Sequence, residues 1–464
     1  MTDLPVRFPH DPWCRAGSRL MLTLDGGTGN CFLGLTPDGK QPGRDMLAGL
    51  TLWRGDSQLP YKAAQENGTM VLRAESGYLS LRLAFPERLV IQGEGVSLLI
   101  GKGRSLGIFM SGGSAVDDSR PGALYVTSGA RMRIVPKTGS VEVRSAWDLN
   151  ALSDPSPQVF LHPDDSGALE AAVYVSDFDC APEESDAPGE PEDFRLFLQR
   201  LTSYPSDEDA LHAAYVVWSC LQPARALADP QITAPLYVSN RRTLGTARLS
   251  DNVLLAALLS DPAEAARQLC SFLPYMDDNG LVPREADNRS RLYEAETPYF
   301  GLVMKARPDV LDAISLRDYE LLRRALNWWL SERRCDDGSF YYLHRYEPGL
   351  GKRTVPEALP GLSSLLNACM GMWMDGMAVL AEKYGKQTDA DIFRTASENL
   401  PAAIRAEEPV PAALELPMLL AADQPFKAQL AKRVMQSEKE FTSLRGALTR
   451  LAAGLSEGGC SHAD

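Results

Sequence analysis

One stretch of the chain, residues 328–353, concentrates side chains that could recognise a polar, ring-shaped ligand. Its sequence is WWLSERRCDDGSFYYLHRYEPGLGKR, in which two adjacent tryptophans precede an acidic turn and an aromatic, charged loop. Aromatic faces stack on the apolar face of a sugar, and polar tips bind its hydroxyl groups. The pattern favours a pocket role for Trp329, His344 and Arg345, with Glu347 as a candidate acid or base. A solvated loop and one face of a β-hairpin are the alternative interpretations.

Two further segments carry polar side chains at the ends of predicted helices. Asp251 follows Ser250 at the start of a helical pattern, so its carboxylate fits either a helix cap or a ligand site. The polar loop at 284–299 is long for a connection, and long loops in compact domains often bind ligands. We therefore add Asp251, Glu296 and Tyr299 as candidate substrate-binding residues, while the loop could also serve only to join two helices.

Composition and charge limit the class of protein. A chain of 464 residues suggests two domains, and fractions of 44% hydrophobic and 23% charged residues are typical of globular proteins. The formal net charge of −14 argues against nucleic-acid binding, which needs a basic surface. No apolar run of roughly 18 residues occurs, and MTDLPVRFPHDPW lacks a basic-then-apolar pattern, so neither membrane association nor a signal peptide is expected.

Cysteine and histidine are dispersed along the chain. The 8 cysteines and 5 histidines include no CxxC pair and no cluster with zinc-ligand spacing. We therefore expect no metal site, no cofactor and no disulfide framework, and we expect reduced thiols in a cytoplasmic protein.

The elements that would position the candidate side chains change in kind along the chain. Residues 1–190 are typical of an antiparallel β-sandwich, because short apolar runs, several of them alternating, are separated by turn residues. The clearest predicted strands are 20–24, 70–74, 79–85, 88–93 and 96–101. A linker is predicted at 191–206, where the acidic, proline-rich stretch APEESDAPGEPED ends.

Residues 207–464 have helical periodicity and form the second predicted domain. Predicted helices cover 207–222, 251–259, 262–276, 298–306, 316–333, 362–384, 388–406, 411–423 and 426–453. Asp336 and Asp337 before Gly338 predict a turn, and the methionines of the helix at 362–384 are predicted to be packing residues.

Several segments, in the same order along the chain, resemble the six-hairpin glycosidases that fold as an (α/α)6 toroid, most closely glycoside hydrolase family 63 and its trehalase-like relatives. The segments at 249–283, 296–306, 327–353 and 365–386 are similar to helix and loop motifs of that family. WCRAGSRLML (13–22) resembles the start of its amino-terminal β-sandwich. The resemblance implies a β-sandwich followed by an (α/α)6-toroid-like helical domain. It also implies a role in carbohydrate metabolism, as an inverting α-glycosidase that binds a glucoside or mannoside.

Inverting hydrolysis needs two carboxylates roughly 6.5–9.5 Å apart, one as general acid and one as base for the attacking water. When the family's ESGLDxSPR motif is matched to EPGLGKR, its acid falls on Gly351, which has no proton to donate. Its base belongs to the last hairpin, and residues 414–448 resemble the lead-in to that hairpin. Glu457, in a tail of small residues, is a poor substitute. The resemblance therefore implies an incomplete toroid in which both usual catalytic positions are empty.

These departures leave three interpretations open. The protein could be a catalytically inactive relative that binds a glycan or serves as a scaffold or subunit. A second copy or another partner chain could cover the open edge of the toroid and supply the missing group. Alternatively, the chemistry could have moved to Glu347, Glu357 or Glu296.

Overall fold

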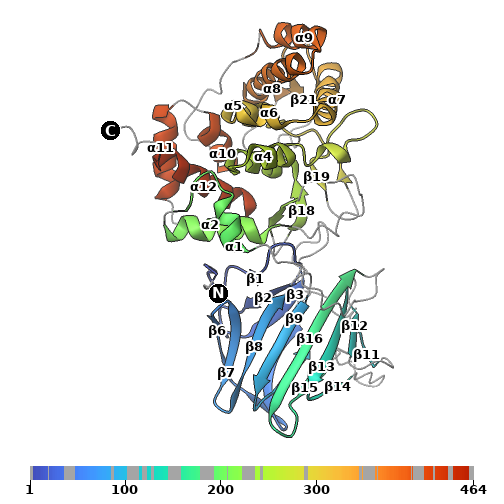
Figure 1. Cartoon of the computed structure of the whole chain (residues 1–464), viewed down its shortest axis with the longest axis vertical. Coiled ribbons are helices and arrows are strands. Elements are labelled where there is room, and N and C mark those ends of the chain that lie inside the picture. The colour runs from blue at the N-terminus through green and yellow to red at the C-terminus, as the bar shows by residue number, and fades with distance from the viewer. Residues whose placement is uncertain are drawn as a thin grey trace. The chain divides into compact units, whose positions relative to one another are not determined.

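The computed structural model describes residues 4–18, 20–35, 48–84, 88–101, 114–117, 123–126, 130–144, 158–177, 193–205, 207–221, 236–240, 244–286, 291–343, 347, 361–362, 364–398, 400, 412–421, 424–436 and 443–458. The chain divides into two compact units (Figure 1). The first consists of residues 1–194, 221–223 and 240–245, and the second of residues 195–220, 224–239 and 246–464.

The first unit is built from two antiparallel sheets. One contains β1 (Trp13–Cys14), β2 (Leu20–Leu24), β3 (Cys31–Leu35), β4 (Ala48–Arg54), β10 (Ser97–Gly101), β15 (Gln158–His162) and β14 (Ser140–Arg144) in that order, with β5 (Ser57–Leu59) paired to β4. The other contains β11 (Ser114–Asp117), β12 (Ala123–Val126), β13 (Ala130–Thr138), β16 (Ala168–Asp177), β9 (Arg88–Glu94), β8 (Gly77–Ala84), β7 (Thr69–Ala74) and β6 (Lys62–Glu66) in that order.

The two sheets share one hydrophobic core, which confirms the predicted β-sandwich. Leu50 of β4 and Leu79 and Leu81 of β8 belong to the same cluster of buried side chains. In β8 these leucines alternate with residues that are partly or fully exposed, as the period of two requires of a strand buried on one face.

The second unit is mainly helical. Its α-helices are α1 (Phe194–Gln199), α2 (Glu208–Ser219), α3 (Leu249–Leu255), α4 (Pro262–Leu269), α5 (Phe300–Ala306), α6 (Asp309–Ala313), α7 (Leu316–Glu332), α8 (Ser364–Lys383), α9 (Gln387–Ser397), α10 (Ala412–Ala421), α11 (Gln424–Met435) and α12 (Leu444–Gly458). Two short 3-10 helices are η3 (Ala256–Leu258) and η4 (Leu273–Tyr275). Small sheets contain β17 (Val238–Asn240), β18 (Leu244–Arg248), β19 (Glu285–Ala286) and β20 (Arg291–Leu292), and β21 (Tyr341–Tyr342) with β22 (Gly361–Leu362).

Four helices close a ring in this unit. α3 contacts α5, α5 contacts α10, α10 contacts α12, and α12 returns to α3. α8 packs against α5, α7 and α9, while α2 and α11 pack against α12 (Figure 1). This ring has four described helices, fewer than the six inner helices of a complete (α/α)6 toroid, and agrees with the predicted incomplete, toroid-like domain.

α8 is a long, apolar helix at the core of the helical unit. It is the one described helix that is long and apolar enough to cross a membrane, and 83% of its most apolar window is buried in the protein, as in a core helix. The methionines that the sequence assigns to packing are confirmed as buried: Met370, Met372, Met374 and Met377.

Three segments differ from the sequence-based expectations. Residues 194–199 of the predicted linker form α1, which buries Phe197 and Leu198. The segment predicted as one helix at 426–453 forms two helices, α11 and α12. Ser443 caps the start of α12, because its hydroxyl accepts a hydrogen bond from the Gly446 N–H at 3.3 Å. The sequence did not predict α6, which the structure shows.

Candidate functional site

A small sheet brings the start of α3 beside the segment that precedes α5. β18 runs directly into α3, and its pairing with β19 places Arg248 opposite Glu285. β19 pairs in turn with β20, after which the chain continues to Glu296. Ser250 and Glu296, 46 residues apart in sequence, therefore come within hydrogen-bonding distance.

The side chains of Ser250, Asp251, Glu296 and Arg445 form a continuous buried network, here called the polar network. The Ser250 hydroxyl donates to Glu296 Oε1 at 2.9 Å, and the Ser250 N–H donates to Glu296 Oε2 at 3.2 Å. Arg445 of α12 donates from Nε to Asp251 Oδ1 at 2.5 Å and from Nη2 to Ser250 Oγ at 2.7 Å. One arginine thus joins two carboxylates, the first directly and the second through a serine.

Asp251 is not a helix cap. Arg248 occupies the N-cap position of α3 without a side-chain capping bond, and Asp251 lies in the first turn, three residues after the N-cap, where it is ion-paired with Arg445. The carboxylate is only 3% exposed and the arginine 21%. The prediction of a ligand-site carboxylate remains open, and the alternative capping role is wrong.

The first turns of α3 and α12 and the segment just before α5 meet at this network. Helix amino termini carry partial positive charge, which favours carboxylates beside them. Two acidic side chains are therefore stabilised at one end of the helical ring, although each is almost fully buried.

Burial raises the pKa of Glu296, and the neighbouring carboxylate of Asp251 adds to this effect, while the cations of Arg248, Arg284 and Arg445 oppose it. For Arg445 itself, burial lowers the pKa, but the charge and hydrogen bond of Asp251, together with Tyr299 and Glu296, more than offset that effect and the net shift is upward. The network therefore combines a permanently charged guanidinium with a carboxyl group that tends to keep its proton.

Glu296 should make the stability of the helical unit depend on pH. Because its pKa is higher in the folded protein than the ordinary value of about 4.3, the folded state keeps a proton that the unfolded chain has lost. Its contribution to stability is complete below the ordinary pKa and decreases as the pH rises towards the raised value. Since glutamine cannot ionise, Glu296→Gln should gain stability relative to the native protein as the pH rises.

Denaturant unfolding followed by far-UV circular dichroism between about pH 5 and pH 8 measures this change. Glu398→Gln, at an exposed position that follows α9, is the matched control and should show no such trend. A difference between Glu296→Gln and the native protein that stays constant with pH would contradict the prediction.

Aromatic residues lie next to the polar network. The Arg445 guanidinium is 5.9 Å from the centroid of the Tyr299 ring. The hydroxyl groups of Thr297 and Tyr342 are hydrogen-bonded at 2.6 Å, and the Tyr342 ring meets Trp329 edge to face at 6.5 Å. Tyr299 and Trp329 are both almost fully buried, and Glu296 and Trp329 line the same small cavity, so candidates from the two predicted segments lie close together.

Glu347 is held by its own loop. Arg333 donates to Glu347 Oε1 at 3.2 Å, and the Leu343 N–H donates to Oε2 at 2.6 Å. The Arg333 guanidinium also lies 4.9 Å from the Trp328 ring centroid. These contacts tie Glu347 to Arg333 at the end of α7 and to Leu343, the residue after β21. His344, Arg345, Gly351 and Glu357 lie outside the described residues.

The cavity that touches Glu296 is small. Its volume is about 10 Å³, and its walls include Leu249, Val282, Trp329 and Trp373. That is room for about one water molecule, whereas small-molecule sites measure roughly 300–1,000 Å³. Among the residues that the structure describes, no group of three or more His, Cys, Asp or Glu side chains is arranged to hold a metal ion.

The sequence-based prediction missed Arg445, Ser250 as a bridging residue, and the Thr297–Tyr342 pair. One signal for Arg445 exists, because LRGALTRL sets two arginines within an otherwise apolar helix and buried arginines require acidic partners. The identity of the partner has no sequence signal, since Arg445 and Asp251 are 194 residues apart.

No protein-family model matches this chain, and no curated protein matches its sequence. Among solved structures, a bacterial glucoamylase complexed with acarbose has a similar fold, with a TM-score of 0.50 at 10% sequence identity. The match covers 84% of this chain and 66% of the glucoamylase, so the chain spans about two thirds of that enzyme's length. The chain has a glycosidase-like fold.

Two family GH92 mannosidases from Bacteroides thetaiotaomicron are also similar. An α-mannosidase matches over 94% of this chain and 74% of its own, at 9% identity and a TM-score of 0.48. An inverting mannosidase matches over 97% of this chain and 74% of its own, at 12% identity and a TM-score of 0.47. The likeness to the glucoamylase is one of fold alone, and it does not point to family 63 in particular.

Proposed function

We propose that this protein is a glycoside hydrolase-like protein of carbohydrate metabolism that binds an α-linked glucoside or mannoside. The binding site would lie at the end of the helical ring where α3 and α12 begin. The polar network supports this proposal most directly, because it gathers Asp251, Glu296 and Arg445 from three distant segments of a glycosidase-like fold. A buried titratable group with a shifted pKa beside specific charges is a functional-site candidate.

Glu296 is the described carboxyl group best suited to replace the acid that Gly351 cannot supply. Its raised pKa favours the protonated form, which a general acid needs before it can protonate a leaving oxygen. Inverting hydrolysis would also require a base for the attacking water, on the opposite side of the sugar. Asp251 is the neighbouring carboxylate, and it is engaged by Arg445.

Binding without hydrolysis is the second candidate function. Asp251 and Glu347 are each ion-paired with an arginine. These pairings favour carboxylates that organise the protein over carboxylates that exchange protons with a substrate.

Binding and turnover can be measured together on the full chain. Maltose and an α-linked mannobiose are the probes, with affinity measured by calorimetry and release of glucose or mannose by a coupled assay. We expect saturable binding of one of the two sugars, and we expect Asp251→Asn to weaken it by about tenfold or more. Asp375→Asn, an exposed carboxylate on α8, is the matched control and should bind as the native protein does.

Turnover that Glu296→Gln abolishes while binding persists would assign the acid to Glu296. Binding without turnover would select the second candidate function. Absence of both binding and turnover for the two sugars, in a protein whose circular dichroism shows it to be folded, would contradict the proposal.

A further inference from the structure

A groove runs along one side of α7 and shares no lining residue with the cavity beside Glu296. Its volume is about 600 Å³, within the range of roughly 300–1,000 Å³ that small-molecule sites occupy. The residues that matter for its chemistry are Arg317, Glu320, Arg323, Arg324, Asn327 and Trp328, together with Asn279 from the turn before β19.

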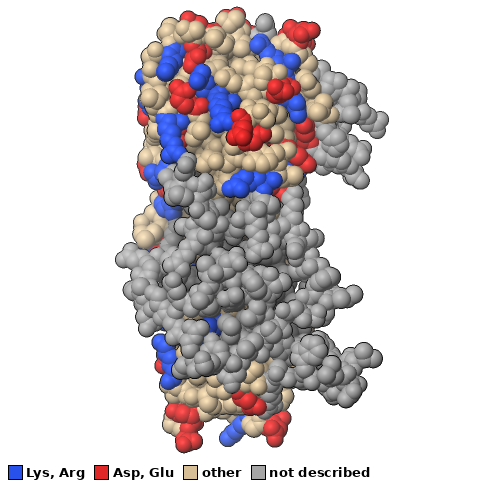
Figure 2. All heavy atoms as spheres, turned by 90° about the vertical axis from the view of Figure 1, so that its right-hand side faces the viewer, with Lys and Arg blue, Asp and Glu red and all other residues tan. Residues whose placement is uncertain are grey.

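The groove is basic on a protein that is otherwise acidic. Three arginines and one glutamate line it, whereas the whole chain has a formal net charge of −14. Figure 2 shows Lys and Arg side chains on this face of the helical unit, with acidic side chains between them. A local excess of positive charge within a concave site attracts an anionic ligand.

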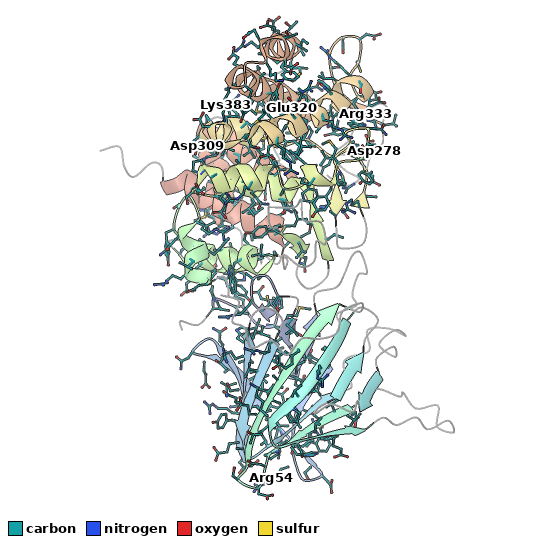
Figure 3. The ribbon with its side chains drawn as sticks, turned by 45° about the vertical axis from the view of Figure 1, so that its right-hand side comes forward. Arg54, Asp278, Asp309, Glu320, Arg333 and Lys383 are labelled. Carbon is teal, nitrogen blue, oxygen red and sulfur yellow. The ribbon has the colours of Figure 1, made fainter. Side chains whose placement is uncertain are left out.

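Two of the three arginines are held in place by the protein. Arg324 donates from Nη2 to the carbonyl oxygens of Asp277 and Asp278, at 2.7 and 2.6 Å. Arg323 donates from Nε to Glu320 Oε2 at 2.9 Å. Figure 3 labels Glu320, on α7, and Asp278. An anion would therefore meet guanidinium groups that have already lost most of their conformational freedom.

Arg317 differs from these two. It is exposed at the first turn of α7, and no carboxylate in the described part of the chain is ion-paired with it. Arginine has a planar set of donors that matches carboxylate and phosphate oxygens. Arg317 is thus the groove arginine whose guanidinium is exposed and is not already held by a described carboxylate or carbonyl group, while Arg324 adds a positive charge that no described carboxylate neutralises.

The remaining lining suits a hydroxylated ligand. The exposed amide side chains of Asn279 and Asn327 can each donate and accept hydrogen bonds, and the ring of Trp328 forms part of the wall. Amide groups beside an aromatic ring are the chemistry that recognises a sugar, and the arginines add a preference for negative charge.

We propose that this groove binds an anionic sugar, either a hexuronate or a sugar phosphate, with Arg317 as the main contact to the anionic group. The site is separate from the polar network and does not depend on the function proposed for it.

Calorimetry on the full chain with glucuronate, glucose 6-phosphate, glucose and inorganic phosphate tests this inference. We expect one of the two anionic sugars to bind saturably, to bind more weakly as salt is added, and to bind more tightly than glucose or inorganic phosphate. The preferred probe distinguishes carboxylate from phosphate recognition. Arg317→Gln should weaken that binding by about tenfold, and Asn327→Ala should weaken it as well.

Arg267→Gln, an exposed arginine on α4, is the matched control and should leave binding unchanged. Asp251→Asn should also leave it unchanged, which separates this site from the polar network. The inference is overturned if neither anionic sugar binds, if inorganic phosphate binds as tightly as the sugars, or if Arg317→Gln binds as the native protein does.

Discussion

Replacing Arg445 with methionine should destabilise the helical unit by about 3–5 kcal/mol, because it leaves a buried carboxylate without its counter-ion. The Asp251 side chain is 3% exposed and receives the Arg445 Nε donor at 2.5 Å. The same substitution removes the Nη2 donor to Ser250, which itself bonds to Glu296. One change therefore disturbs the contacts among α3, α12 and the segment before α5.

Denaturant unfolding followed by far-UV circular dichroism measures this loss, since the signal is dominated by the helical unit. Arg267→Met, at an exposed position on α4, is the matched control and should change stability by about 0.5 kcal/mol or less. Adding Asp251→Asn to Arg445→Met should restore part of the loss, because it removes the unpaired charge. A loss below about 1 kcal/mol for Arg445→Met would show that the pair is solvated rather than buried.

Replacing Gly301 with alanine should cost about 3 kcal/mol or more, the second large effect that we expect. A Cβ atom at Gly301 of α5 would lie 2.0 Å from the backbone N of Trp373 and 2.4 Å from its Cα in α8. Backbone atoms cannot rotate aside as a side chain can. The two helices would have to separate, and the buried contact between the Phe300 and Trp373 rings, now 4.9 Å apart between centroids, would weaken.

Two other helical glycines provide graded controls. A Cβ at Gly376 would meet the flexible side chain of Met304 at 2.6 Å, so Gly376→Ala should cost less than Gly301→Ala. A Cβ at Gly454 of α12 would lie 3.9 Å from Arg450 Nη1, an ordinary contact, so Gly454→Ala should stabilise the protein by about 0.5–1 kcal/mol through helix propensity. Equal effects at all three positions, measured as melting temperatures, would refute the close approach of α5 and α8.

Local patterns were sufficient to predict much of the fold. The alternation of leucines in β8, the turn at Asp337, whose carboxylate accepts the Ser339 N–H at 2.9 Å, and the apolar face of α7 each depend on neighbours a few residues away. The split between α11 and α12 was harder to predict, because a single serine restarts the helix within a polar stretch that has helical composition.

The candidate site, too, could be predicted only in part from the sequence. The amino-acid types were enough to select Glu296, Tyr299 and Trp329, since acidic and aromatic side chains near helix ends suit polar ligands, while Asp251 was selected through the family resemblance. Sequence could not assign their partners. Ser250 reaches Glu296 only because β18, β19 and β20 pair in a particular register.

Sequence by itself therefore determined the β-then-helical order of the chain and the positions of most elements, because these follow from periodicity, turns and caps over short distances. Only the tertiary structure decided that Arg445 neutralises Asp251 and that Glu347 accepts a hydrogen bond from the Leu343 N–H. It also decided that Gly301 leaves room for the backbone of α8. These contacts join residues that are distant in sequence or depend on how a turn closes, and their energies come from burial, which a linear pattern does not contain.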